Sequence, residues 1–157
     1  MKTQHIITMV FAALLLLGAT ANAGEKELSE DKVPKAVLEA FAKEYPTVKK
    51  REFEKEMFEG KTVYEVEYKD NGKEYEVLYT ADGILLQKEE EIDVNTLPEA
   101  VIGAIKKAHP KAEIKEAEKL MKADGTVTGY EVEVKTGKKK LELELDAAGK
   151  ILKTERD

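Results

Sequence analysis

Apolar and charged residues alternate strictly over residues 64–79, YEVEYKDNGKEYEVLY, with Asn-Gly in the middle. Period-two alternation is typical of a β-strand with one buried face, and Asn-Gly is a favoured two-residue hairpin turn. This turn fixes the register of the hairpin, and it predicts that Val66 lies opposite Val77 and Glu67 opposite Glu76. Residues of like charge that face each other across strands normally destabilise a sheet.

A second stretch, YEVEVKTGKKKLELEL at residues 130–145, nearly repeats the first. The same register places Glu133 opposite Glu142 and Glu131 opposite Glu144. The chain therefore builds the same acidic sheet face twice.

Helical periodicity also occurs twice, in VPKAVLEAFAKEYP at residues 33–46 and in LPEAVIGAIKKAHP at residues 97–110. Apolar residues recur there every three or four positions, and a proline bounds each segment at both ends. This pattern predicts two amphipathic helices. Asp31 and Asn95 occupy positions where N-capping residues are expected.

Alternating segments with Gly-containing turns between them follow each predicted helix. They predict strands at residues 48–58, 62–69, 73–80, 84–91, 112–121, 128–135, 139–146 and 150–155. The fold class predicted from this order is α+β, with two tandem repeats, each one helix packed on a four-stranded antiparallel meander. The predicted repeats are residues 24–91 and 92–157, packed as one globular unit because each is small alone.

The predicted sheet has an apolar face, which packs against the helices, and a face rich in Glu and Lys. The candidate binding residues are the glutamates of that second face: Glu65, Glu67, Glu76, Glu131, Glu133, Glu142 and Glu144. Three interpretations of this face are open. It is a solvated outer surface offset by lysines, or it meets a basic protein surface, or its carboxylates hold a cation such as calcium.

The first 23 residues predict a secretion signal rather than part of the fold. A short basic start precedes the apolar run IITMVFAALLLLGA, and ANA at residues 21–23 is typical of a cleavage site. We therefore expect a periplasmic or secreted protein without membrane insertion. The full chain has a formal net charge of −6, which argues against nucleic acid as a partner, and it has no cysteine.

Residue types that carry common catalytic chemistry are scarce. Beyond the signal the chain has one serine, Ser29, and one histidine, His109. Nucleophilic triads, zinc sites and phosphate-binding loops therefore have few residues to use. We predict no enzyme activity, no catalytic residue, no cofactor and no specific metal-ligand set.

The Pro-opened helices ending in Tyr-Pro or His-Pro, the Tyr-Glu-Val-Glu strands and the turns at Gly83 and Gly149 resemble the β-lactamase-inhibitor-like, PepSY-like family of secreted bacterial proteins. The resemblance implies tandem helix-plus-four-strand units and a non-enzymatic protein, with inhibition or protein binding as its role. We expect a binding module that uses the acidic face, with a basic protein surface or a protease as partner. The alternative is a calcium- or small-ligand-binding envelope protein.

Overall fold

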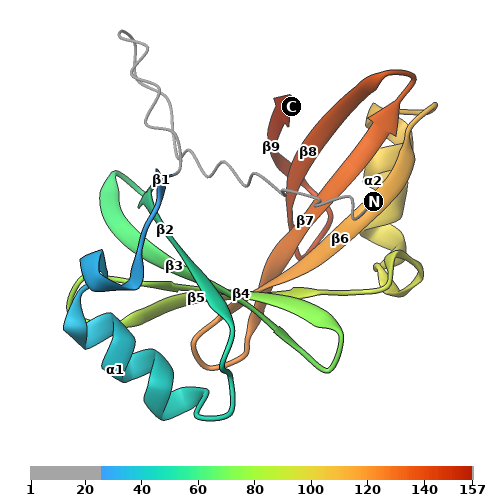
Figure 1. The fold of residues 1–157 in the computed structure, drawn as a ribbon. Helices are drawn as coiled ribbons and strands as arrows, with labels where there is room; N and C mark the ends of the chain where they lie inside the picture. Colours follow the sequence, from blue (N-terminus) through green and yellow to red (C-terminus); the bar gives the residue numbers. More distant parts are fainter. Residues whose placement is uncertain (1–25, 157) are drawn as a thin grey trace, which may run out of the picture.

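The structure is a computed structural model that describes residues 26–156; the predicted signal peptide at residues 1–23 lies outside this range. Nine antiparallel strands form one sheet in chain order (Figure 1). The strands are β1 (Lys26–Glu27), β2 (Arg51–Phe58), β3 (Lys61–Asp70), β4 (Lys73–Tyr79), β5 (Leu85–Glu91), β6 (Glu113–Lys122), β7 (Val127–Thr136), β8 (Lys139–Asp146) and β9 (Ile151–Arg156). The helices are α1 (Lys35–Glu44) and α2 (Glu99–Ala108), each preceded by a 3-10 turn, η1 (Glu30–Lys32) and η2 (Val94–Thr96).

The predicted fold class, α+β with two repeats of a helix on a four-stranded meander, is wrong. The described chain is mostly β, and its strands form one continuous half-barrel sheet rather than two separate meanders. The strand pair β5–β6, which the sequence analysis did not predict, joins the two halves, with five residue pairs from Gln87↔Lys122 to Glu91↔Glu118. An unpaired strand edge leaves backbone hydrogen-bonding groups unsatisfied, and this pairing satisfies them for both halves.

The two predicted helices are confirmed, but their predicted caps are not. Each helix has a proline at its N-cap, Pro34 or Pro98, with no capping hydrogen bond from a side chain. Asp31 and Asn95 lie earlier, inside the 3-10 turns η1 and η2. The extra turn before each proline displaces them from the helix start.

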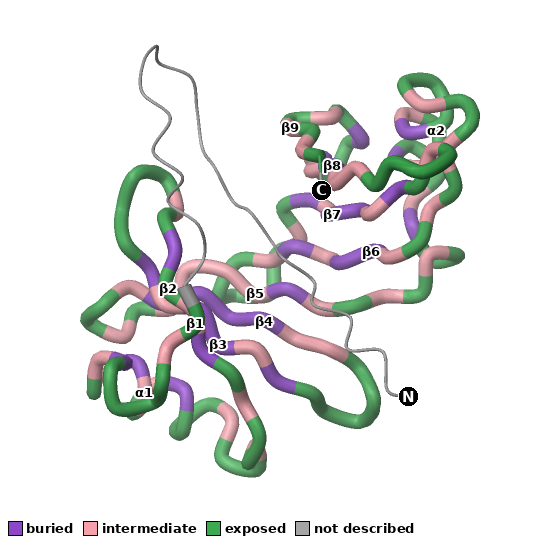
Figure 2. Tube along the Cα trace, turned by 45° about the horizontal axis from the view of Figure 1, so that its top comes forward, coloured by how far each residue is buried: buried purple, intermediate pink, exposed green. Residues whose placement is uncertain are grey.

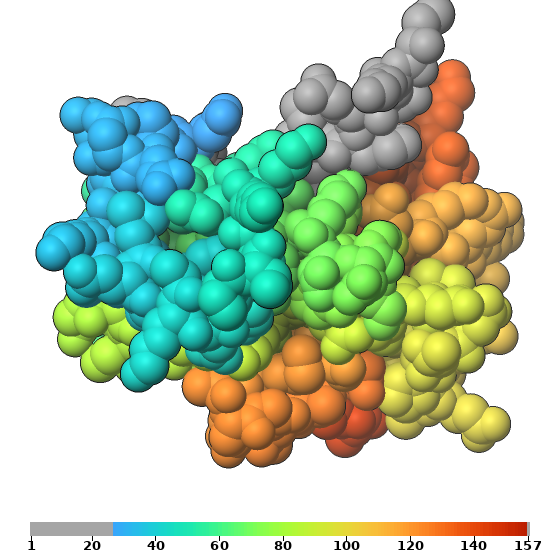
Figure 3. Space-filling view, turned by 60° about the horizontal axis from the view of Figure 1, so that its bottom comes forward, coloured from blue at the N-terminus to red at the C-terminus, as the bar shows by residue number. Residues whose placement is uncertain are grey.

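Two hydrophobic clusters fill the space between the sheet and its helices. Buried Val37 and Phe41 of α1 pack on β2, β3 and β4, and buried Val101 and Ile105 of α2 pack on β6, β7 and β8. Figure 3 shows that the regions of α1 (cyan) and of the segment leading into α2 (yellow) lie at opposite ends of the molecule. No helix among residues 26–156 is both long and apolar enough to span a membrane.

The predicted hairpin registers are confirmed. Glu67 pairs with Glu76, and the pairs Glu131↔Glu144 and Glu133↔Glu142 follow in the second hairpin. The sheet curves strongly, both helices lie on the outside of the curve, and buried positions run through the strands in the middle of the sheet (Figures 1 and 2). The glutamates therefore lie on the concave inside.

Candidate functional site

The concave side of the sheet carries carboxylates on every strand from β2 to β8. Period-two alternation and the strand registers place these residues opposite the helix-packed side chains. We call this surface the acidic face and define it by Glu54, Glu56, Glu65, Glu67, Glu76, Glu89, Glu118, Glu131, Glu133, Glu142 and Glu144.

The structure places all seven glutamates predicted from the sequence on the acidic face. Glu67, Glu133, Glu142 and Glu144 are half-buried. Glu65, Glu76 and Glu131 are each only 6% exposed, so the interpretation of a solvated outer surface is wrong for these three. The curvature of the sheet explains the difference, because it crowds the carboxylates of neighbouring strands toward one another.

Sequence reasoning missed the residues at the centre of the face. Glu89 of β5 is 1% exposed and Glu118 of β6 is 7% exposed. Glu89 pairs with Glu76 across β4–β5, and Glu118 pairs with Glu131 across β6–β7. The alternation along each strand is a signal that could have placed both on this face. Their mutual proximity depends on the β5–β6 pairing, which joins segments separated by α2.

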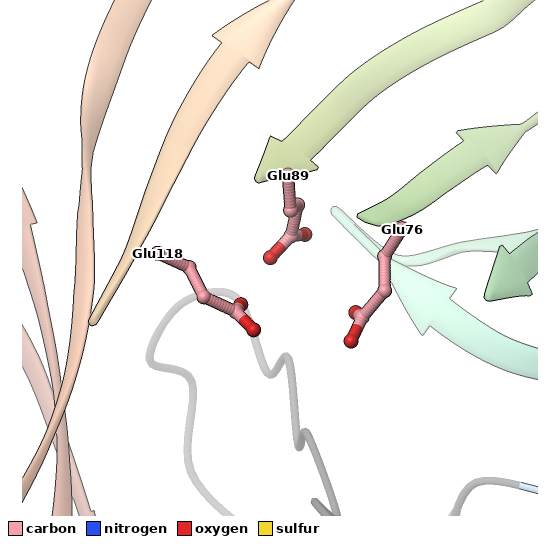
Figure 4. A group of neighbouring side chains, drawn as sticks. All are labelled: Glu76, Glu89 and Glu118. Atoms are coloured by element: carbon pink, nitrogen blue, oxygen red, sulfur yellow. The ribbon is translucent and has the colours of Figure 1, made fainter. Parts of the chain in front are cut away.

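Three of the buried carboxylates, one from each of three neighbouring strands, converge. The carboxylates of Glu76, Glu89 and Glu118 each offer one oxygen within 4.8 Å of the other two (Figure 4). We call these residues the glutamate triad. In each of them Oε2 is buried and has no hydrogen-bond partner among residues 26–156. Gln87 Nε2 donates a hydrogen bond to Oε1 of Glu89 at 3.0 Å.

Burial raises the pKa of every triad carboxyl, because the charged form loses its hydration. The pKa of Glu118 rises to about 8, and the neighbouring carboxylates Glu74 and Glu142 add to the effect of burial. The pKa of Glu76 and the pKa of Glu89 are also raised well above the ordinary value, first by burial and then by the surrounding glutamates. Burial therefore favours the protonated, uncharged form of the triad carboxyls.

Ion pairs occur at the rim of the acidic face. Lys140 Nζ lies 2.6 Å from Glu133 Oε2, and Lys153 Nζ lies 2.8 Å from Glu155 Oε2. A third pair joins Lys69 to Glu74. Among residues 26–156 no salt bridge reaches a carboxylate of the triad, so lysine side chains pair with carboxylates at the edge of the face and not at its centre.

The tyrosines lie mainly on the other side of the sheet, toward α1. Tyr68 stacks on Tyr75 with ring centroids 5.3 Å apart, and Phe41 meets Tyr68 edge-on at 5.4 Å. These rings belong to the first hydrophobic cluster. They stabilise the fold from the side of the sheet that faces α1, opposite the concave side that carries the carboxylates.

Both halves of the chain match family models. Residues 85–153 match the family described as "Putative beta-lactamase-inhibitor-like, PepSY-like", and residues 27–82 match the peptidase propeptide and YPEB domain, known as PepSY. No curated protein matches the chain at a significant level.

Several solved structures from Bacteroides share the fold. A BLIP-like protein from Bacteroides fragilis is 25% identical with a TM-score of 0.55, and the match covers 78% of this chain and 84% of that one. A protein from Bacteroides eggerthii, described as one of the "putative periplasmic proteins", is 17% identical with a TM-score of 0.63 over 79% and 88% of the two chains. A DUF2874 family protein from Bacteroides ovatus is 18% identical with a TM-score of 0.61 over 80% and 89%.

The resemblance predicted from the helix, strand and turn motifs is therefore confirmed: the second half of the chain matches the PepSY-like, β-lactamase-inhibitor-like family itself, and the first half matches the PepSY domain model.

Proposed function

We propose that this protein is a non-enzymatic binding module of the bacterial envelope and that its acidic face receives a basic surface of another protein. The observation that carries the proposal is the gathering of glutamates from every strand between β2 and β8 on one concave side. A hollow with one sign of charge concentrates the field and attracts groups of the opposite sign.

The half-buried members of the face suit contact with a partner. Glu67, Glu142 and Glu144 lie around the buried triad on β3 and β8 and keep part of their surface accessible. Arginine and lysine side chains from a partner would form charge-assisted hydrogen bonds with them. Such pairs favour selectivity and fast association more than affinity, and their strength falls as salt rises.

The comparisons support both the kind of function and the place. The relative from Bacteroides fragilis is described as BLIP-like, and the matching family as β-lactamase-inhibitor-like, which favours binding over catalysis. The relative from Bacteroides eggerthii is described as periplasmic, which agrees with the secretion signal predicted for residues 1–23. We assign the mature chain to the periplasm.

A pull-down from a bacterial periplasmic extract tests the proposal. The baits are the mature protein and a variant in which four half-buried glutamates of the acidic face are replaced: Glu67→Gln, Glu133→Gln, Glu142→Gln and Glu144→Gln. We expect the native bait to retain a basic protein at low salt and to release it as the salt concentration rises. The variant should lose that protein.

A matched control removes the same charge elsewhere, through four exposed glutamates of the helices and a turn: Glu39→Gln, Glu44→Gln, Glu59→Gln and Glu99→Gln. This control should retain the partner, because it lowers the net negative charge by the same amount and leaves the acidic face intact. If the two variants lose the partner equally, or if no bait retains one, the acidic face is not a protein-binding site.

A further inference from the structure

We propose that the glutamate triad, Glu76, Glu89 and Glu118, is a binding site for a single calcium-class divalent cation. The site lies at the join of the two halves, on β4, β5 and β6 (Figure 4). It is independent of the proposed protein partner. The sequence left calcium binding open as an alternative without a specific site, and the triad supplies one. Two of its three ligands, Glu89 and Glu118, are not among the seven glutamates predicted from the sequence.

The spacing of the three carboxylates suits one ion. Calcium binds oxygen ligands at about 2.3–2.6 Å, so two oxygens on the same ion lie no more than about 5 Å apart. The triad offers one oxygen from each residue within 4.8 Å of the others. All three come from adjacent strands of one sheet, which holds their backbones in fixed register.

The burial of unpartnered oxygens is the independent observation that points to a ligand. Oε2 of Glu76, of Glu89 and of Glu118 is buried without a hydrogen-bond partner in the described part of the chain, and these residues are only 6%, 1% and 7% exposed. A buried carboxylate without compensation costs several kcal/mol, on the order expected for any desolvated ion. A fold that buries three together needs either protons or a cation at their centre.

The surroundings supply negative charge and an apolar wall. Glu131 lies beside the triad on β7 and acts on all three members, and Glu67, Glu74 and Glu142 each act on one of them. Leu78 lies two residues after Glu76 on β4, and Leu120 lies two residues after Glu118 on β6, so both share the face of the triad. Both leucines are buried and place apolar side chains beside the carboxylates. No salt bridge within residues 26–156 brings a lysine or arginine to the triad, whereas Glu90, on the opposite side of β5, binds both Lys73 and Lys119.

The donor set favours calcium over magnesium. Magnesium keeps several of its waters and uses one or two carboxylates, whereas calcium accepts six to eight oxygens in flexible geometry. Three converging carboxylates, with Glu131 nearby as a further donor, offer more anionic oxygens than magnesium uses. Gln87 binds Oε1 of Glu89, and Oε2 of Glu89 has no hydrogen-bond partner among the described residues.

Calorimetry and thermal melting of the chelator-treated mature protein test the site. Calcium chloride is the ligand, and magnesium is the comparison. We expect calcium to raise the Tm by several degrees at saturating concentration, and magnesium at equal ionic strength to raise it much less. No binding heat would mean that the carboxyls only share protons, and a Tm shift of equal size with both metals would overturn the assignment to calcium.

Two single variants make the test specific. Glu89→Gln removes one ligand charge and keeps the shape and the bond to Gln87, and it should weaken calcium binding by at least tenfold. The matched control is Glu133→Gln, which changes the same face at a residue paired with Lys140 and outside the triad. It should bind calcium like the native protein. Equal calcium affinity in both variants would overturn the proposal, even if the protein-binding experiment succeeded.

Discussion

The carboxyl groups at the centre of the acidic face determine how stability responds to pH. Glu118 has a pKa raised from 4.5 to about 8, first because it is buried and then because of neighbouring carboxylates. The folded state therefore holds a proton that the unfolded state has already lost. This contribution to stability is fully present below about pH 4.5 and is lost as the pH rises through about 8.

Glu118→Gln isolates this effect, because glutamine has the shape of a protonated glutamate and no charge. In metal-free buffer we expect the native protein to be less stable at pH 8 than at pH 5, and the variant to remove much of that difference. The gain at pH 8 should be on the order of a few kcal/mol, given about 1.4 kcal/mol for each unit of pKa. Urea denaturation at the two pH values measures it.

The control for this experiment is Glu113→Gln. Glu113 is exposed, and its pKa is lowered by its bond to Lys115. Its stabilising contribution has the opposite sign with pH: it is present above about 4.5 and is lost as the pH falls. It should therefore not rescue the protein at pH 8, and if it does, net charge rather than burial causes the pH dependence.

A glycine-containing turn of the sheet packs closely against the first residues of each helix. Gly83, between β4 and β5, has φ +80°, and a Cβ added there would lie 2.5 Å from the carbonyl oxygen of Ala36 in α1. Gly149, between β8 and β9, has φ +85° and would place a Cβ 2.6 Å from the carbonyl oxygen of Ala100 in α2. Only glycine satisfies both the left-handed backbone and the close approach.

Gly83→Ala should therefore destabilise the protein more than the same change in an open turn. Gly72, in the β3–β4 turn, has φ +83° with nothing within 4 Å of an added Cβ, so Gly72→Ala is the matched control. The control should cost about 1 kcal/mol for the left-handed conformation alone, and Gly83→Ala at least about 1 kcal/mol more because α1 must shift. Denaturant unfolding of both variants measures the difference, and equal losses would show that the turn does not press on the helix.

The elements predicted correctly are those that local sequence determines. Asn71-Gly72 fixes a two-residue turn, so the pairing of Glu67 with Glu76 follows directly. The β5–β6 pairing depends on two segments separated by η2 and α2, and no turn between them sets their register. For this reason the single sheet, its curvature, and the meeting of Glu89 with Glu118 were not predictable from periodicity, although each glutamate's face was.

At the scale of the whole molecule, one sheet joins two hydrophobic clusters that share no residue. The first cluster lies under α1 and the second under α2. The five residue pairs of β5–β6 and the bonds from Glu90 to Lys73 and Lys119 connect them. Neither half can unfold without exposing a strand edge of the other. We therefore expect the whole sheet to unfold in one cooperative transition.

Phe41→Ala and Ile105→Ala test this coupling, because the two residues occupy matching positions on α1 and α2 and are 2% and 1% exposed. Each truncation should cost about 3 kcal/mol through lost burial and a cavity, and lower the Tm by roughly 10 °C. Calorimetry should show one transition that moves as a unit in both variants, with near-ultraviolet signals from the tyrosines of the first cluster lost at the same temperature. The decisive observation is made in Ile105→Ala, because Ile105 lies in the second cluster. If the tyrosine signal of the first cluster is lost at the lowered Tm of this variant, the two clusters unfold together. A second transition that leaves the tyrosine signal at its native temperature would show that the β5–β6 pairing is too weak to make the halves cooperative.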